Sequence, residues 1–64
     1  MELRNIKSFL KIAECGSFSQ AANYLGYAQS TVTFQIQQLE EELGYSLFER
    51  IGKKISLTSY GENF

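Results

Sequence analysis

The sequence predicts a mainly α-helical domain of three helices, followed by a short two-stranded β-hairpin and the start of a fourth helix. Three observations favour this fold class. Apolar residues recur at three- and four-residue steps along each of the first three segments. Each of these segments is followed by a glycine, at position 16, 26 or 44, where helices commonly end. Residues 46–57 show the pattern of a β-hairpin.

The first helix is expected over residues 3–15. Its predicted apolar stripe has Phe9 beside it and consists of Leu3, Ile6, Leu10 and Ala13. A capping box formed by Ser17 and Gln20 then starts the second helix. The predicted buried stripe of this helix consists of Phe18, Ala21, Ala22 and Leu25. Gly26 ends it.

The third helix is expected over residues 29–43. The side chains predicted to bury one narrow face are Val32, Ile36, Leu39 and Leu43. Two strands, 46–50 and 53–57, are expected around Ile51-Gly52 and form the hairpin, or wing. Thr58 can cap a helix that starts at Ser59. Because the sequence stops at Phe64, inside that helix, we expect it to be part of a longer protein.

The relative spacing of four core residues predicts a helix-turn-helix motif. Ala22 lets two helices approach closely, and Gly26 permits the sharp turn between them. Val32 and Ile36 return one face of the following helix to the core. This motif places its second helix in the major groove of DNA. The spacing therefore predicts a DNA-binding domain.

The outward face of residues 29–43 is expected to contact DNA bases. From Cys15 to Leu39 the sequence has no charged residue, and its last eleven positions are rich in Gln, Ser and Thr. Neutral amides and hydroxyls suit base edges better than phosphates. On this helix the candidate DNA-binding residues are Gln29, Ser30, Thr31, Thr33, Phe34, Gln35 and Gln38. The alternative for the glutamines is a solvated helix surface.

Phe34 is the one large apolar residue on this outward face. Its ring can contact the methyl group of a thymine in the major groove. The alternative is an ordinary exposed apolar residue, which proteins tolerate. The first turn of the same helix can also hold a phosphate through its free backbone N–H groups, without any basic side chain.

Charge is unevenly distributed along the chain, although the net charge is only −1. The basic residues Arg50, Lys53 and Lys54 lie in the predicted hairpin and are candidate DNA contacts beside the groove. Their alternative is a solvated hairpin tip. The acidic residues 40–42 would be repelled by DNA, so we expect a solvated face there.

The composition argues against catalysis and against secretion. The sequence has no His and no Asp, which removes most acid–base groups and the commonest metal ligands, so we expect neither a catalytic site nor a metal or cofactor. Cys15 is the only cysteine and is expected to be a small core residue. No apolar run is long enough for a membrane span. A single cytoplasmic domain is expected.

Many of these residues occur together, in register, in one known family. The set resembles the amino-terminal domain of LysR-type transcriptional regulators across essentially the whole chain, and consists of Phe9, Ala13, Gly16-Ser17-Phe18, Ala21-Ala22, Leu25, Gln29, Ile36, Leu39-Glu40, Leu43-Gly44, Leu47-Phe48, Arg50 and Leu57-Thr58-x-x-Gly61. The resemblance implies a winged helix-turn-helix over residues 1–58 and the start of a linker helix over 59–64. It implies double-stranded DNA as the partner, with helix 29–43 in the major groove and wing 46–57 on the backbone or minor groove.

The resemblance also carries expectations for single residues and for the longer protein. It supports Gln29, Ser30, Thr33 and Phe34 as groove-facing residues and Arg50 as a wing contact. Three positions depart from the family pattern: Ala28 replaces a frequent Ser or Thr cap, Ser30 a frequent Pro, and Phe34 a frequently basic residue. In the longer protein, the linker helix would pair two subunits and a carboxy-terminal domain would bind a small-molecule inducer.

The main alternative function is a winged-helix module that binds another protein. An acidic outward face would favour that function, but residues 29–38 are uncharged. A helical domain without a partner would leave the clustering of Gln and Thr unexplained.

Overall fold

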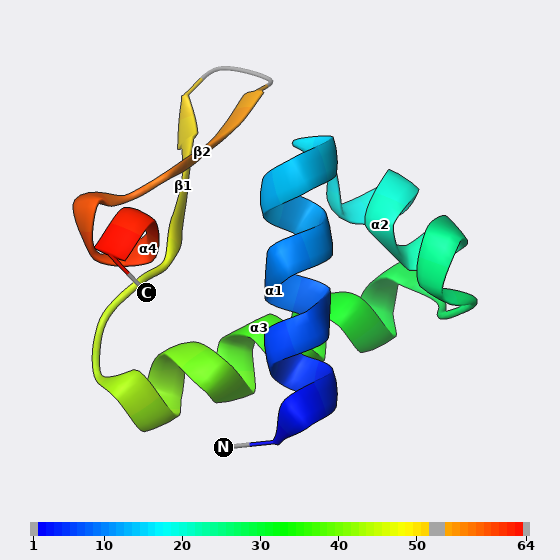
Figure 1. Cartoon of the computed structure of the whole chain (residues 1–64), viewed down its shortest axis with the longest axis horizontal. Helices are drawn as coiled ribbons and strands as arrows, with labels where there is room; N and C mark the ends of the chain where they lie inside the picture. The colour runs from blue at the N-terminus through cyan, green and yellow to red at the C-terminus, as the bar shows by residue number, and fades with distance from the viewer. Residues whose placement is uncertain (1, 52–53, 64) are drawn as a thin grey trace.

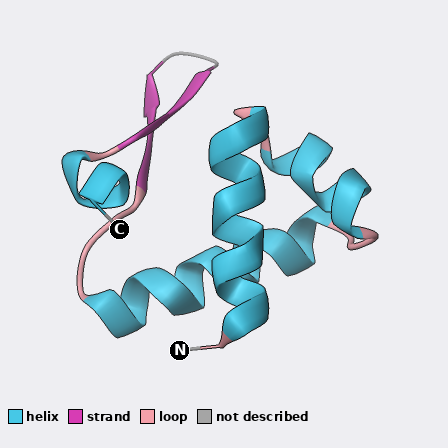
Figure 2. Ribbon diagram, in the orientation of Figure 1, coloured by secondary structure: helices cyan, strands magenta, loops and turns pink. Residues whose placement is uncertain are grey.

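The predicted order of elements is confirmed by the computed structural model, which describes residues 2–51 and 54–63 and only the backbone at residues 50, 51 and 54. The described elements are α1 (Leu3–Cys15), α2 (Phe18–Leu25), α3 (Gln29–Leu43), β1 (Phe48–Ile51), β2 (Lys54–Leu57) and α4 (Ser59–Asn63). Helices α1, α2 and α3 pack against one another, and the hairpin stands to one side of them (Figure 1; Figure 2).

The turn between α2 and α3 depends on a glycine in a left-handed conformation. Gly26 has a φ of 78°, which a residue with a side chain adopts only under strain. This conformation lets the Tyr27 N–H donate to the carbonyl of Ala22 at 2.9 Å. Ala22 is itself only 2% exposed, because its small side chain lies in the core where the helices meet. The helix-turn-helix predicted from this spacing is confirmed.

The core lies where the three long helices meet. It contains Phe9, Ile12, Ala21, Ala22, Val32, Ile36, Leu39 and Leu47. The buried faces predicted for α2 and α3 are confirmed except at Leu25, which is only half-buried, and Phe18 and Leu43 pack at the edge of this core. Burial of each large aliphatic side chain stabilises the fold by about 1.5–3 kcal/mol before the entropy cost is subtracted.

The buried face predicted for α1 is only partly right: Phe9 is buried and Ile6 packs against the core, but Leu3, Leu10 and Ala13 are exposed. The helix is rotated so that Asn5, Ser8, Phe9 and Ile12 face inward. Leu3 is 67% exposed and Leu10 is 58% exposed. Two hydrogen bonds to α3 explain the difference, because they satisfy polar groups that would otherwise be costly to bury.

Both hydrogen bonds join α1 to α3 through side chains. The Asn5 Nδ2 donates to the Gln38 Oε1 at 3.2 Å, and the Ser8 hydroxyl donates to the Gln35 Oε1. We call Asn5, Ser8, Gln35 and Gln38 the polar seam. In the described part of the chain, every buried side-chain nitrogen or oxygen has a hydrogen-bond partner.

Cys15 is exposed, which contradicts the expectation that it lies in the core. It is the last residue of α1, and Gly16 turns the chain away directly after it. The last fully buried side chain of this helix is that of Ile12, one turn earlier.

The hairpin pairs antiparallel, with Phe48 opposite Leu57 and Ile51 opposite Lys54. Ile51 therefore belongs to β1, and its predicted place in the connection between the strands is wrong. At the base of the hairpin, the Phe48 ring lies 5.3 Å from the ring of Phe9 and 5.6 Å from that of Phe18, measured between centroids. These aromatic contacts fix the hairpin against α1 and the start of α2.

The start of α4 is held by the predicted cap at Thr58. The Thr58 Oγ1 accepts the Gly61 N–H at 3.1 Å and donates to the Ser46 carbonyl at 2.6 Å. The Thr58 N–H donates to the Leu47 carbonyl at 3.0 Å. A Cβ on Gly61 would lie 2.3 Å from that same carbonyl oxygen, so only glycine allows this approach. The first turn of α4 is thus fixed to the segment before β1.

Candidate nucleic-acid interface

Helix α3 turns one side to the core and the opposite side to solvent. The predicted contact residues that lie exposed are Gln29, Ser30, Thr31, Phe34 and Gln38, while Thr33 is half-buried. Phe34 is 62% exposed, nearly opposite Val32 and Ile36. Between Gln29 and Gln38 the helix carries no charge. The structure therefore presents a neutral surface of amides and hydroxyls around one aromatic ring.

Gln35 does not belong to this surface, and its assignment as a DNA contact is wrong. It is 6% exposed, and its Oε1 accepts the hydrogen bond from Ser8. Its position on the helix lies beside Val32 and Leu39, so its amide points toward α1. The sequence signal was present but ambiguous, because Gln35 sits at the edge of the helix face that carries the other glutamines.

Gln38 is exposed, but the oxygen of its side-chain amide is held by a hydrogen bond. Its Oε1 accepts from Asn5, which is itself 1% exposed. Sequence analysis missed both Asn5 and Ser8. Together with Phe9 and Ile12 they have the i, i+3, i+4, i+7 spacing of a buried helix face, and this pattern competes with the more apolar stripe that the sequence favoured.

The amino-terminal end of α3 has no side-chain cap. Ala28 occupies the cap position, and no side chain accepts a hydrogen bond from the first turn. The Thr31 N–H reaches the Ala28 carbonyl at 3.1 Å, while the N–H groups before it have no partner within an α-helix. The positive end of the helix dipole therefore lies next to the exposed hydroxyl and amide side chains.

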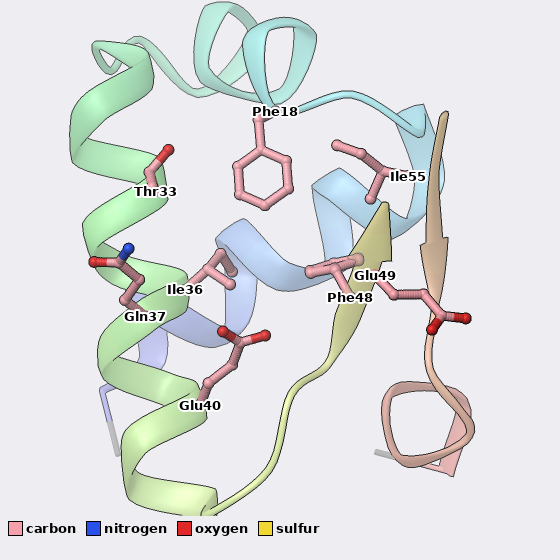
Figure 3. A pocket seen from close by; sticks show the side chains of 8 residues that line it. All are labelled: Phe18, Thr33, Ile36, Gln37, Glu40, Phe48, Glu49 and Ile55. Carbon is pink, nitrogen blue, oxygen red and sulfur yellow. The ribbon is translucent and has the colours of Figure 1, made fainter. Parts of the chain in front are cut away.

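A hollow separates α3 from the hairpin (Figure 3). Its apolar walls come from Phe18, Ile36, Phe48 and Ile55, and its polar rim from Thr33, Gln37, Glu40 and Glu49. The Glu40 carboxylate accepts the Leu47 N–H at 2.8 Å, which ties α3 to the start of the wing. Glu40 and Glu49 place carboxylates on this rim, so phosphates are disfavoured there. The amino-terminal half of α3 has no acidic side chain and is therefore the half that an anion can approach.

A second hollow lies on the other flank of α3, against the start of α1. It is lined by Glu2, Arg4, Asn5, Thr31, Phe34, Gln35 and Gln38. The Arg4 Nε donates to the Glu2 carboxylate at 3.0 Å. Phe34 and Gln38, four residues apart on α3, thus line the same depression.

The predicted basic contacts of the wing are only partly placed. Arg50 pairs with Ile55, and Lys54 pairs with Ile51, so both belong to the hairpin backbone. Their side chains, and Lys53 as a whole, lie outside the described residues. Their role in binding stays a prediction.

Within residues 2–51 and 54–63, no group of His, Cys, Asp or Glu side chains is arranged to hold a metal ion. None of the helices in these ranges has the length and apolar character needed to cross a membrane.

The chain matches, over residues 3–62, the family described as bacterial regulatory helix-turn-helix protein, lysR family. It belongs to this family, as its motifs indicate, and the family is one of regulators and not of enzymes. The HTH-type transcriptional regulator YwqM of Bacillus subtilis (strain 168) is 50% identical over 64 residues, which is 100% of this chain and 22% of that protein.

Two solved structures of DNA complexes have the same fold. The DNA-binding domain (DBD) of BenM in complex with catB site 1 DNA has a TM-score of 0.95 and 44% identity, covering 100% of this chain and 72% of that one. The CbnR DBD–DNA complex has a TM-score of 0.94 and 42% identity, covering 100% and 74%. The chain spans about a fifth of the length of the curated relatives YwqM and YtlI.

Proposed function

We propose that this chain is the sequence-specific DNA-binding domain of a LysR-type transcriptional regulator, with α3 in the major groove of duplex DNA. The observation that carries the proposal is the uncharged outward surface of α3 between Gln29 and Gln38, next to the amino-terminal end of the helix, which has no side-chain cap. Two relatives with this fold, the BenM and CbnR DBDs, were solved as DNA complexes, which supports the same use here.

Different groups on α3 would contact different parts of the DNA. Gln29, Ser30, Thr31 and Thr33 offer donors and acceptors to base edges, and Phe34 offers its ring to a thymine methyl group. The uncapped first turn of α3 offers backbone N–H groups to a phosphate. Binding would therefore depend more on base contacts than on ion pairs.

The hairpin would add the basic contacts. Arg50, Lys53 and Lys54 would lie on the phosphate backbone or in the minor groove beside α3. The aromatic contacts of Phe48 with Phe9 and Phe18 support this role, because they hold the hairpin in one place relative to the helices.

In the longer protein, α4 would continue as the linker helix that pairs two subunits, so that residues 1–58 form the DNA-binding unit. A carboxy-terminal domain would bind a small-molecule inducer, and the regulator would act in the cytoplasm, where its DNA lies. The fixed first turn of α4, held by Thr58 and Gly61, supports the pairing role, since a linker must leave the domain in a defined direction.

Titration with duplex DNA tests the function. We expect the chain to bind mixed-sequence duplex at low salt and to enrich particular sequences from a randomised pool at moderate salt. Gln29→Ala should reduce that enrichment, whereas Gln37→Ala, at an exposed glutamine nearer the acidic end of α3, should leave it intact. A folded chain that binds no duplex would support the protein-binding alternative, and one that binds duplex but enriches no sequence would contradict sequence-specific binding.

A further inference from the structure

The contact between Asn5 and Gln38 turns the oxygen end of the Gln38 amide toward α1 and its NH₂ end away from it. Asn5 is 1% exposed, and its Nδ2 donates to the Gln38 Oε1 at 3.2 Å. Turning over the Gln38 amide alone would bring two N–H donors together. One lone pair of the Gln38 Oε1 is therefore occupied, while the NH₂ group, which only donates hydrogen bonds, is the end turned away from Asn5 and toward a ligand.

The neighbouring contact has the same direction. Ser8 on α1 donates to the Oε1 of Gln35 on α3, so both donors come from α1 and both acceptors from α3. Asn5 lies in the first part of α1, where that helix crosses α3 (Figure 1). The polar seam thus sets both the position of α3 and the orientation of the one seam amide that is exposed.

A glutamine with both amide atoms free pairs best with adenine, accepting from N6 and donating to N7. In Gln38, Asn5 holds the oxygen by one of its two lone pairs and so turns it away from the position that this pairing with adenine requires. We propose, on the basis of the proposed function, that Asn5 is a specificity-determining residue that makes Gln38 a hydrogen-bond donor and directs it to an acceptor edge in the major groove.

Phe34 narrows the choice of base to thymine. It lies one helical turn from Gln38, and both line the hollow at the start of α1. Thymine presents the O4 acceptor directly beside its methyl group. A donor from Gln38 and an apolar ring from Phe34 match those two groups together, whereas guanine offers the acceptor without the methyl.

The first experiment locates the base pair that depends on Gln38. Duplexes enriched from a randomised pool by the 64-residue chain are compared with those enriched by Gln38→Ala. We expect one position to lose its preference, and we expect that position to be a T·A pair in the wild type. An unchanged preference at every position, or a dependent position that is not T·A, would overturn the inference while leaving the proposed function intact.

Base analogues then identify the atom that is contacted. Replacing the thymine with an analogue that lacks O4 should weaken wild-type binding about fivefold and should have no further effect on Gln38→Ala. Replacing the paired adenine with purine, which lacks the N6 amino group, should have no effect. Sensitivity to the missing N6 amino group would mean that Gln38 accepts a hydrogen bond, and the inference would be wrong.

Changing Asn5 tests whether it sets this orientation. Asn5→Asp replaces the donor with a carboxylate, which accepts from Gln38 and turns its Oε1 outward. Sensitivity should then move from the thymine O4 to the adenine N6 amino group. Asn23→Asp, the same change at an exposed asparagine of α2, should not move it. Ser8→Ala should weaken the seam and lower the melting temperature without changing the base preference.

Two results in this series would contradict the role of Asn5. One is an Asn5→Asp chain that melts like the wild type and keeps its sensitivity to O4. If Asn5→Asp does not fold, Asn5→Ala decides instead: it removes the donor and lets the Gln38 amide turn over, so binding should lose part of its sensitivity to O4 and gain sensitivity to the N6 amino group. The other contradicting result is a folded Asn5→Ala chain that keeps its full sensitivity to O4 and gains none to the N6 amino group. A wild-type chain that enriches no sequence at all would defeat the inference and the proposed function together.

Discussion

Gln35 and Gln37 are two residues apart on α3 and have opposite roles. Gln35 is 6% exposed and accepts a hydrogen bond from Ser8, while Gln37 is exposed at the rim of the hollow beside the hairpin. The residue type alone did not distinguish them. Their positions around the helix axis did, because a step of two residues on an α-helix turns a side chain by about 200°.

Removing the Gln35 side chain should destabilise the fold. Gln35→Ala leaves the buried Ser8 hydroxyl without its acceptor and opens space in the polar seam. We expect a loss of about 1–3 kcal/mol in the free energy of unfolding, measured by urea denaturation. Gln37→Ala is the control and should stay within about 0.5 kcal/mol of the wild type. Equal effects of the two changes would contradict the burial of Gln35.

Phe34 should matter for DNA binding and hardly at all for stability. Because it is 62% exposed, Phe34→Ala should change the free energy of unfolding by no more than about 0.5 kcal/mol, whereas Ile36→Ala should cost about 2–5 kcal/mol. The same Phe34→Ala change should weaken binding to the preferred sequence by about 1–3 kcal/mol and barely alter non-specific binding.

A methyl deletion in the DNA checks the Phe34 contact from the other side. Uracil in place of the contacted thymine should weaken wild-type binding and have little further effect on Phe34→Ala. Leu10→Ala, which removes another exposed apolar side chain (58% exposed) on α1, should leave binding unchanged. A Phe34→Ala chain that unfolds, or that keeps its full preference, would rule the contact out.

At the scale of elements, the boundaries of the helices were predictable and the rotation of α1 was not. Glycines in the left-handed conformation and the hydroxyls of Ser17 and Thr58 set the ends of helices, and these signals are local. The rotation of α1 depends on α3, because Asn5 and Ser8 are buried only where Gln38 and Gln35 accept their hydrogen bonds. A search for apolar spacing cannot detect such a pair of polar contacts.

The join between α4 and the hairpin should depend on Gly61. Gly61→Ala would place a Cβ 2.3 Å from the Leu47 carbonyl oxygen and 3.0 Å from Leu57, so α4 must move away. We expect a net loss of about 1–3 kcal/mol in the free energy of unfolding, although alanine is the better helix former. Ser59→Ala, at an exposed position of the same helix, is the control.

The tyrosine pair beside this join reports its local structure. The rings of Tyr45 and Tyr60 stack with centroids 4.6 Å apart. Displacement of α4 in Gly61→Ala should therefore reduce the near-ultraviolet circular dichroism of the tyrosines. A Gly61→Ala chain with wild-type stability and an unchanged spectrum would show that the close approach is not needed.

For the whole molecule, the net charge of −1 and the neutral face of α3 predict a shallow salt dependence of DNA binding. We expect log affinity to fall with log salt at a slope of about −2 to −4, because few counterions are released. Arg50→Ala should flatten that slope by about one unit and leave the sequence preference largely intact. Loss of the preference in Arg50→Ala would show that the wing reads bases.

The fold class and the helix-turn-helix were predictable because they follow from helical periodicity and turn residues within the first 44 positions. Of the candidate contact residues on α3, most lie exposed as predicted, and Gln35 does not. The contribution of Asn5 could not be predicted, because it depends on a side chain 33 positions away along the chain.

The polar seam also bears on how new DNA specificities arise in this fold. Helix α3 is not a cassette that can be exchanged by itself, because two of its glutamines are matched to Asn5 and Ser8 on another helix. A chimaera that receives α3 from a relative would need positions 5 and 8 from the same donor protein. Without them, the grafted helix would have the contact residues of the donor protein, but their side chains would be wrongly oriented.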